Sequence, residues 1–144
     1  NKNEQLSTHS SMHFNGPEGI LNQIHKGAAS ENSHCIFNGA IFVPKIAQKT
    51  DANQLSRNLL LSNKARIDTK PELKIIADNV KCAHGATVSQ LQEDELFYLR
   101  SRGIESSKAT SLLLKGFCQE IIQDLPLNAN RWSILEILLQ SVMK

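Results

Sequence analysis

A repeat of 23 residues is the feature that most limits what this chain can fold into. Four short words begin at this spacing: "HFNG" at 13, "IFNG" at 36, "LLLS" at 59 and "CAHG" at 82. Their last residues form one column of Gly16, Gly39, Ser62 and Gly85, as expected if each coil turns or packs closely at the same place. Such a repeat is typical of stacked β-solenoid coils, although four near-matches also arise by chance in a β-rich sequence.

The repeat also predicts which side chains face inward. Residues one period apart stack in a solenoid, so we expect an inward apolar file of Phe14, Phe37, Leu60 and Ala83. Alternation along each strand then gives two outward columns: His13, Ile36, Leu59, Cys82 and Asn15, Asn38, Leu61, His84. Cys82 and His84 are therefore predicted to face outward. The apolar members Ile36, Leu59 and Leu61 would need a covering surface, which predicts a sheet-to-sheet partner.

The sequence pattern changes from β to helical near residue 90. Before it, short β-type runs such as "HCIF", "AIFV", "NLLL" and "LKIIA" are separated by Asn, Gly, Asp and Pro. After it, "EDELFYLRSRG" carries acids in its first turn, arginines in its last and Gly103 as a stop. We therefore predict a mainly β domain over 1–90, the C-terminal portion of a longer solenoid, and a small helical domain over 91–144.

Two further helices are predicted in the second domain. The first spans about 106–124, ends before Pro126 and has an apolar stripe at helical spacing: Ala109, Leu112, Leu113, Phe117 and Ile121. The second follows an Asn-rich turn and has its own apolar side: Trp132, Leu135, Leu138, Leu139 and Val142. Together with the first short helix they form a helical tail.

Composition and charge exclude several classes of function. The 144 residues have a formal net charge of +2 with the signs interspersed, so nucleic acid is not an expected partner. No apolar run approaches the length of a membrane span, so no membrane partner is expected. The start has neither an initiator Met nor an apolar signal core, and we expect a piece of a longer protein. Cys35, Cys82 and Cys118 lack C-x-x-C spacing, which fits free thiols in a cytosol-like compartment.

The sequence does not indicate an enzyme. It contains no Gly-rich phosphate loop with Lys, no G-x-S-x-G and no H-E-x-x-H. The acids Glu93, Asp94 and Glu95 sit at a helix start, where the helix dipole accounts for them. A β-solenoid enzyme acting on polysaccharides would need paired carboxylates on one outer face, and the predicted outward columns contain none.

Cys82 and His84 are the candidate site residues. In an extended chain, side chains two apart share a face, so this thiol and imidazole could both reach one metal, cluster or partner surface. The alternative is packing in an ordinary strand. Cys35 and Cys118 are interpreted as packing residues, because Cys35 shares a strand face with the inward Phe37. The other histidines lack paired ligand spacing and are expected to be surface residues: His9, His13, His25 and His34.

One long segment resembles a known family. The run "IDTKPELKIIADNVKCAHGATVSQLQEDELFYLRSRGI", residues 67–104, closely resembles the C-terminal part of SufD, in the SufB/SufD family of the SUF iron–sulfur cluster assembly machinery. "FNGAIFV" and "NLLLSNKARIDTKP" match it too, and the likeness extends over residues 9–124. It implies a right-handed parallel β-helix followed by a helical domain. It also implies a non-catalytic scaffold subunit that pairs with SufB and binds the ATPase SufC, in bacterial cytoplasm or plastid stroma.

The resemblance assigns roles to single residues. Ala65 stands where SufB has a cysteine, and "HGAT" replaces the "HEAT" typical of SufB, so SufD is favoured over its paralogue. His84 matches the family histidine near the SufB–SufD interface that is implicated in building the nascent cluster, with Cys82 beside it. One pair cannot saturate a cluster, so we expect no cofactor held by this chain alone and a transient iron–sulfur cluster shared with the partner.

The helical tail resembles the region that engages SufC. Tyr98, Arg100 and Arg102 are candidates for that contact, and a solvated helix end explains them equally well. A SufB-like paralogue, or a purely structural β-helix assembly module without a cluster role, stays as the alternative. Because a solenoid end exposes a coil edge, the isolated chain is expected to self-associate. A strictly monomeric sedimentation profile at all concentrations would contradict that expectation.

Overall fold

The computed structural model describes residues 3–126, 129 and 131–142, with the backbone alone at 131, 132, 141 and 142. Six strands come first: β1 (Gln5–His13), β2 (Ile20–Ala29), β3 (His34–Val43), β4 (Asp51–Leu60), β5 (Arg66–Ile75) and β6 (Lys81–Gln90). Three helices follow: α1 (Glu93–Ser101), α2 (Ser106–Gln123) and α3 (Arg131–Val142). The protein is therefore mainly β, with a short helical tail.

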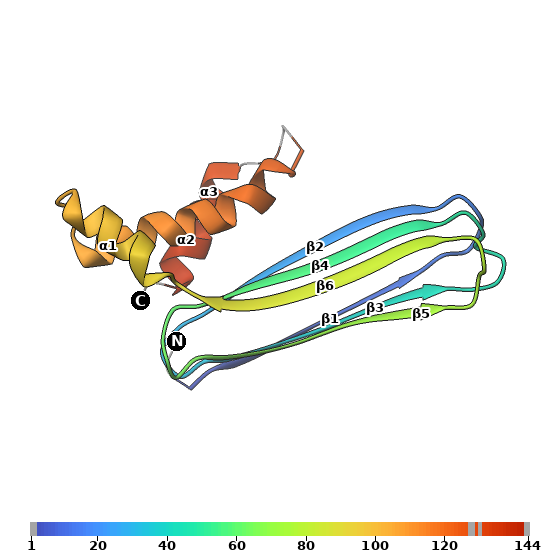
Figure 1. Ribbon diagram of the computed structural model, residues 1–144, viewed down its shortest axis with the longest axis horizontal. Coiled ribbons are helices and arrows are strands. Elements are labelled where there is room, and N and C mark those ends of the chain that lie inside the picture. Colours follow the sequence, from blue (N-terminus) through green and yellow to red (C-terminus); the bar gives the residue numbers. More distant parts are fainter. Residues whose placement is uncertain (1–2, 127–128, 130, 143–144) are drawn as a thin grey trace.

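The strands form two parallel sheets, and the chain alternates between them. Sheet A has the order β1-β3-β5 and sheet B the order β2-β4-β6. Two consecutive strands thus make one coil, and each coil lies on the one before it, as Figure 1 shows. The helices lie beyond one end of the strands, with α2 against β2.

The coil period is longer than the 23 residues that the sequence words suggest. Gln5 pairs with His34 and His34 with Arg66, so a coil of sheet A takes 29 and then 32 residues. In sheet B, Ile20 pairs with Asp51 and Asp51 with Lys81, which gives 31 and 30. The predicted stacking of Phe14, Phe37, Leu60 and Ala83 is wrong, and so are the two outward columns derived from it.

The reason is that the four repeated words lie in different parts of the coil. Phe14 follows the end of β1, a strand of sheet A, and Phe37 lies within β3 of the same sheet. Leu60 ends β4 and Ala83 lies near the start of β6, both in sheet B. The stacking partners of Phe37 are instead Thr8 and Thr69.

The two sheets enclose an interior that is apolar on one side and polar on the other. Sheet A contributes Phe37, Ile41 and Val43, all buried. Sheet B contributes from β4 the buried residues Ala52, Gln54, Ser56 and Asn58. Because side chains alternate across a strand, these even-numbered residues of β4 define the inner face of sheet B.

The register carries this inner face to β6 and reverses the predicted orientation of the candidate site. Cys82 pairs with buried Ala52, and His84 pairs with buried Gln54. Cys82 packs against the core, whereas Ala83 is exposed. Cys82 and His84 therefore share a face, as predicted, but it is the inner face and Ala83 is on the outer one.

The apolar side chains that were predicted to need a covering partner surface are largely buried within this chain. Leu59 alternates with Asn58, so it lies on the outer face of sheet B, yet it is only 7% exposed within this chain. Ile36 and Leu61 are half-buried. These three leucine and isoleucine side chains thus give no argument for a sheet-to-sheet partner.

The helices follow their predictions closely. The first ends at Ser101, and Gly103 has the positive φ of 80° that favours glycine after a helix. The second has nearly the predicted bounds, and the third contains the residues predicted for it. The buried residues of α2 are Ala109, Leu114 and Ile122, whereas Leu112 is 49% exposed, so the predicted stripe is wrong in part. In α3, Leu135 is buried, and the side chains of residues 132 and 142 lie outside the described part.

Candidate functional site

The candidate site lies on the last strand of sheet B. Within the described residues, β6 pairs with β4 on one side only. His84 is exposed for this reason, although its side chain lies on the face that is buried one strand earlier, at Gln54. The site is therefore a rim where the interior of the coil meets the surface.

Cys82 is the more protected member of the pair. It is half-buried and packs against an apolar cluster: Ile41, Val43, Ala47, Ala52 and Ala77. Burial raises the pKa of the Cys82 thiol, and a hydrogen bond with the backbone of Ala52 opposes this only in part. The thiol is therefore protonated at neutral pH, the form that packs well but does not bind a metal or cluster.

His84 is better placed to act as a ligand. Its imidazole is exposed on the rim, and a neutral ring nitrogen is a common ligand of transition metals. In the part of the chain that the structure describes, no three histidine, cysteine, aspartate or glutamate side chains gather as a metal site. The rim supplies at most part of a ligand set.

A polar ladder inside the coil leads to the rim, and the sequence analysis missed it. Gln54 Nε2 donates a hydrogen bond to Gln23 Oε1 at 2.7 Å, and Gln23 Nε2 donates to Ser10 Oγ at 2.9 Å. Gln54 is only 2% exposed, although a polar residue in a strand usually faces solvent. No clear sequence signal marked it, since four of the five residues of "QLSRN" in β4 are polar.

A second interior group surrounds His25. Its ring stacks on Phe37 with centroids 3.8 Å apart, and its Nδ1 lies 3.3 Å from Ser56 Oγ. Burial lowers the pKa of His25, so the ring is neutral at neutral pH. The prediction that His25 is a surface residue is therefore wrong. His34 is instead held by Asp68 on the surface of sheet A, at 2.7 Å.

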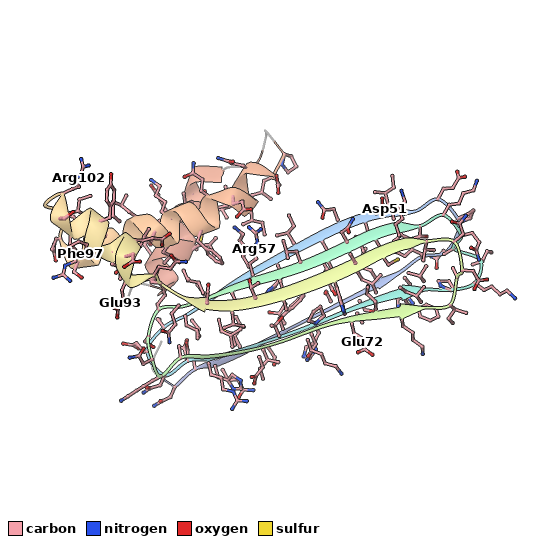
Figure 2. The ribbon with its side chains drawn as sticks, in the orientation of Figure 1. Asp51, Arg57, Glu72, Glu93, Phe97 and Arg102 are labelled. Atoms are coloured by element: carbon pink, nitrogen blue, oxygen red, sulfur yellow. The ribbon has the colours of Figure 1, made fainter. Side chains whose placement is uncertain are left out.

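The helical candidates gather on α1, beyond the end of the strands (Figure 2). Tyr98 is 57% exposed, and the Arg102 guanidinium lies over its ring at 5.2 Å. Arg100 is in the last turn, where its charge complements the helix dipole. Phe97, which the sequence analysis did not select, is 73% exposed, and α1 has no buried residue.

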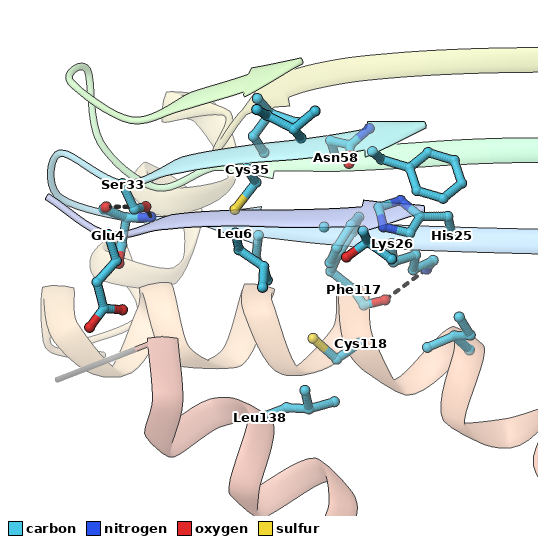
Figure 3. Close-up of a pocket in the computed structure, with 18 residues that line it drawn as sticks. Glu4, Leu6, His25, Lys26, Ser33, Cys35, Asn58, Phe117, Cys118 and Leu138 are labelled. Carbon is cyan, nitrogen blue, oxygen red and sulfur yellow. Dashed lines mark hydrogen bonds between the residues drawn. The ribbon is translucent and has the colours of Figure 1, made fainter. Parts of the chain in front are cut away.

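A cavity of about 430 Å³ lies between the strands and the helices. Figure 3 shows Cys35 entering it from β3 and Cys118 from α2, with Leu138 of α3 near the latter. Burial raises the pKa of both thiols. Both cysteines are half-buried and protonated at neutral pH, which agrees with their interpretation as packing residues.

One lysine joins the helical tail to sheet B. The side chain of Lys26 on β2 is only 4% exposed, and its Nζ donates to the carbonyl oxygen of Phe117 at 2.7 Å, as Figure 3 shows. The same Nζ lies 4.6 Å from the centroid of the Phe117 ring and pairs with Glu120. Arg57 of β4 donates to the same carboxylate at 2.9 Å. The hydrogen bond from Lys26 is the largest cause that lowers the pKa of Glu120. We call these four residues the clamp.

Breaking the clamp should release α2 from the sheet. In Glu120→Gln, buried Lys26 loses its counter-charge, and we expect amide hydrogen exchange in α2 to accelerate about tenfold. The double variant Lys26→Met, Glu120→Gln removes both charges and should restore much of the protection. Equal exchange in wild type and Glu120→Gln would contradict the role of the clamp.

The clamp also has a defined dependence on pH. The folded pKa of Glu120 lies below its ordinary value of 4.5, so its contribution is complete above that value and disappears as the pH falls through the lowered pKa. Protection of α2 should therefore not change between pH 7 and 5.

Comparison with known proteins places this fold and rim in a family. The family model described as "SUF system FeS cluster assembly, SufBD core domain" matches residues 1–117. That range contains every strand, the clamp lysine and the Cys82–His84 rim. The chain belongs to the SufBD family.

Several relatives support this assignment. An iron–sulfur cluster assembly SufBD family protein of Synechocystis is 55% identical over 120 residues, which cover 83% of this chain and 26% of the relative. SufD of Escherichia coli is 41% identical over 86% of this chain and 29% of its own length. The chloroplastic protein ABCI7 of Arabidopsis thaliana is 44% identical over 86% of this chain and 26% of its own.

The SufBD chain thus spans between a quarter and a third of the length of these relatives. They come from bacteria and from a chloroplast-containing plant. Among the described residues, no helix has both the length and the hydropathy to cross a membrane.

Proposed function

We propose that this chain is the C-terminal part of a SufD-like scaffold subunit of the SUF iron–sulfur cluster assembly complex. In this proposal the subunit is non-catalytic, pairs with SufB and binds the ATPase SufC. The observation that carries it is the SufBD core match over residues 1–117, together with 41% identity to a protein named SufD. The soluble compartment would be the bacterial cytoplasm or the plastid stroma.

The stacked coils support a right-handed parallel β-helix as the complete fold. Every strand pair that the structure describes is parallel, and consecutive strands lie in opposite sheets. In such a fold the rim of the last coil exposes the unpaired edges of β5 and β6. We propose that this rim faces the paralogous subunit.

Residues at two positions support a SufD-like rather than a SufB-like chain. Ala65 is buried in a small cluster with Ala29 and Ile67, where the SufB pattern has a cysteine. The word "HGAT" at 84–87 departs from "HEAT" of SufB. A SufB-like paralogue is therefore the weaker alternative.

The rim supports a shared cluster site. A nascent iron–sulfur cluster is cargo rather than a resident cofactor here, and it needs more ligands than one imidazole. We propose that His84 supplies one transient ligand and SufB the others. Cys82 is the second candidate. Because burial raises the pKa of its thiol, the thiol must lose a proton before it can bind a cluster.

We propose α1 as part of the SufC contact. Phe97 and Tyr98 are exposed apolar and aromatic side chains, and Arg100 and Arg102 add positive charge beside them. Exposed aromatic and arginine side chains are enriched in protein interfaces.

Co-purification of the full-length protein that carries this chain tests the assignment. Affinity capture under mild salt should recover a paralogous SufBD subunit and an ATPase. A Phe97→Ala, Arg102→Ala variant should lose the ATPase but retain the paralogue. Capture of neither protein would refute the proposed function.

A further inference from the structure

Gln54 is the buried residue next to His84 in the stacking register. We propose that Gln54 is a positioning residue for His84: its buried amide oxygen accepts a hydrogen bond from one ring nitrogen and leaves the other nitrogen free to bind the nascent cluster. This inference rests on the proposed function and adds a residue to it.

The register places the two residues next to each other on one face. Gln23, Gln54 and His84 are consecutive Cα partners across β2, β4 and β6. Side chains that are paired in register on the same face of neighbouring strands lie within contact distance. His84 is thus the next rung after Gln54 in the column that already contains the Gln54–Gln23 hydrogen bond.

The direction of the ladder leaves an acceptor for His84. Gln54 gives its Nε2 to Gln23, and Gln23 gives its own Nε2 to Ser10. Gln54 Oε1 is buried and has no hydrogen-bond partner within the described chain. An unsatisfied buried acceptor costs about 1–3 kcal/mol, so a donor at this position is favoured. Since Nε2 and Oε1 are on opposite sides of the amide carbon, an amide whose Nε2 is directed to β2 has its oxygen away from β2.

The neighbours of His84 on the inner face of β6 leave it as the donor. Cys82 offers a weak S–H donor and packs in the apolar cluster, and Ala86 has no polar side chain. An imidazole N–H is a strong donor. Histidines that bind metals commonly donate their second ring N–H to a fixed acceptor, which sets the tautomer and the ring orientation.

Gln54 is itself held in place from the opposite sheet. Gly39 on β3 faces it so closely that a Cβ at Gly39 would lie 2.3 Å from Gln54 Nε2. The amide is therefore confined between Gly39 and Gln23, and its 2% exposure excludes bulk water as a substitute partner. A confined acceptor orients a histidine better than a mobile one.

The test uses the full-length protein with histidine-selective 15N labelling and long-range ring spectra at alkaline pH. The His84→Gln variant identifies its signals. We expect one dominant tautomer in the wild type and in Gln54→Glu, which keeps an acceptor. Gln54→Met fills similar space without an acceptor and should produce a mixture of tautomers, with cluster loading on the assembled complex reduced about tenfold.

Gln23→Met provides a second variant if a change at Gln54 prevents folding. It leaves the Gln54 amide free to turn, so the tautomer preference should weaken without a change at the rim itself. Identical His84 ring spectra in wild type, Gln54→Met and Gln23→Met would overturn the inference. A switch to the opposite tautomer in Gln54→Glu would also overturn it, because it would show that in the wild type the facing ring nitrogen accepts from the amide group.

The two proposals fail in different ways. Normal cluster loading in His84→Ala would refute the proposed function of the rim. Lost loading in His84→Ala together with unchanged ring spectra in Gln54→Met would refute the role of Gln54 alone.

Discussion

Replacement of Gly39 by alanine is expected to lower the free energy of unfolding by about 2–4 kcal/mol, from overpacking and a broken buried hydrogen bond. The new Cβ would lie 2.3 Å from Gln54 Nε2 and 2.8 Å from Cζ of Phe37. Phe37 is a rigid ring that is 3% exposed and stacked on His25, so it cannot move aside. Gln54 can move only if it loses its hydrogen bond to Gln23.

A shorter partner should rescue this variant in part. In Gly39→Ala, Gln54→Ser, the close contact with Nε2 disappears, and the double variant should lose less stability than the two single variants together. Gly16→Ala is the control, because a Cβ there meets no atom within 4 Å, and its effect should remain within about 0.5 kcal/mol. Thermal unfolding of each variant gives the comparison.

Equal midpoints for Gly39→Ala and Gly16→Ala would show that the interior is looser than the contacts indicate. A loss of stability that Gln54→Ser does not reduce would assign the strain to Phe37 alone.

The helices could be predicted because their signals are local. The acids at 93–95 begin the helix and Gly103 directly follows its end, so no distant residue is needed to interpret them. The buried side of α2 depends instead on its neighbours. Because α1, α3 and β2 all contact it, Leu114 and Ile122 are buried while Leu112 is exposed.

The coil period could not be obtained from the repeated words, because stacking joins residues about 30 positions apart. The turns repeat with the true coil period, but the residues at equivalent turn positions are not similar in sequence. Glu18 and Lys49 both have positive φ, of 61° and 60°, and stack with their side chains paired at 3.0 Å. Glycine or asparagine usually marks such a conformation, so a glutamate and a lysine gave no sequence signal.

The orientation of the rim was wrong for a related reason. Residues two apart share a face whatever the register, so the pairing of Cys82 with His84 was secure. The choice between the inner and outer face required the correct stacking partner. The stacking partner of His84 is Gln54, which is polar but buried. A strand pattern normally assigns leucines such as Leu55 to the interior and residues such as Gln54 and Ser56 to the surface, so the inner face of β4 could not be identified from the sequence.

Replacement of His84 by alanine is expected to reduce iron–sulfur cluster maturation at least tenfold in cells that rely on SUF, while the complex still forms. His84 is exposed on the rim, so the loss of its side chain removes the proposed ligand and leaves the core cluster around Cys82 intact. Thr87→Ala is the matched control, since Thr87 lies on the outer face of the same strand and pairs with Arg57. Maturation of a reporter iron–sulfur enzyme and the yield of the complex are measured together.

Cys82→Ala separates the two candidates on the rim. Its thiol is protonated and packed, so the variant should lose some thermal stability and keep most of its maturation activity. If Cys82→Ala instead loses maturation as completely as His84→Ala, the partner must deprotonate this thiol and the rim provides two ligands. If both variants mature clusters normally in an intact complex, the chain is a structural module, and the rim serves assembly of the complex alone.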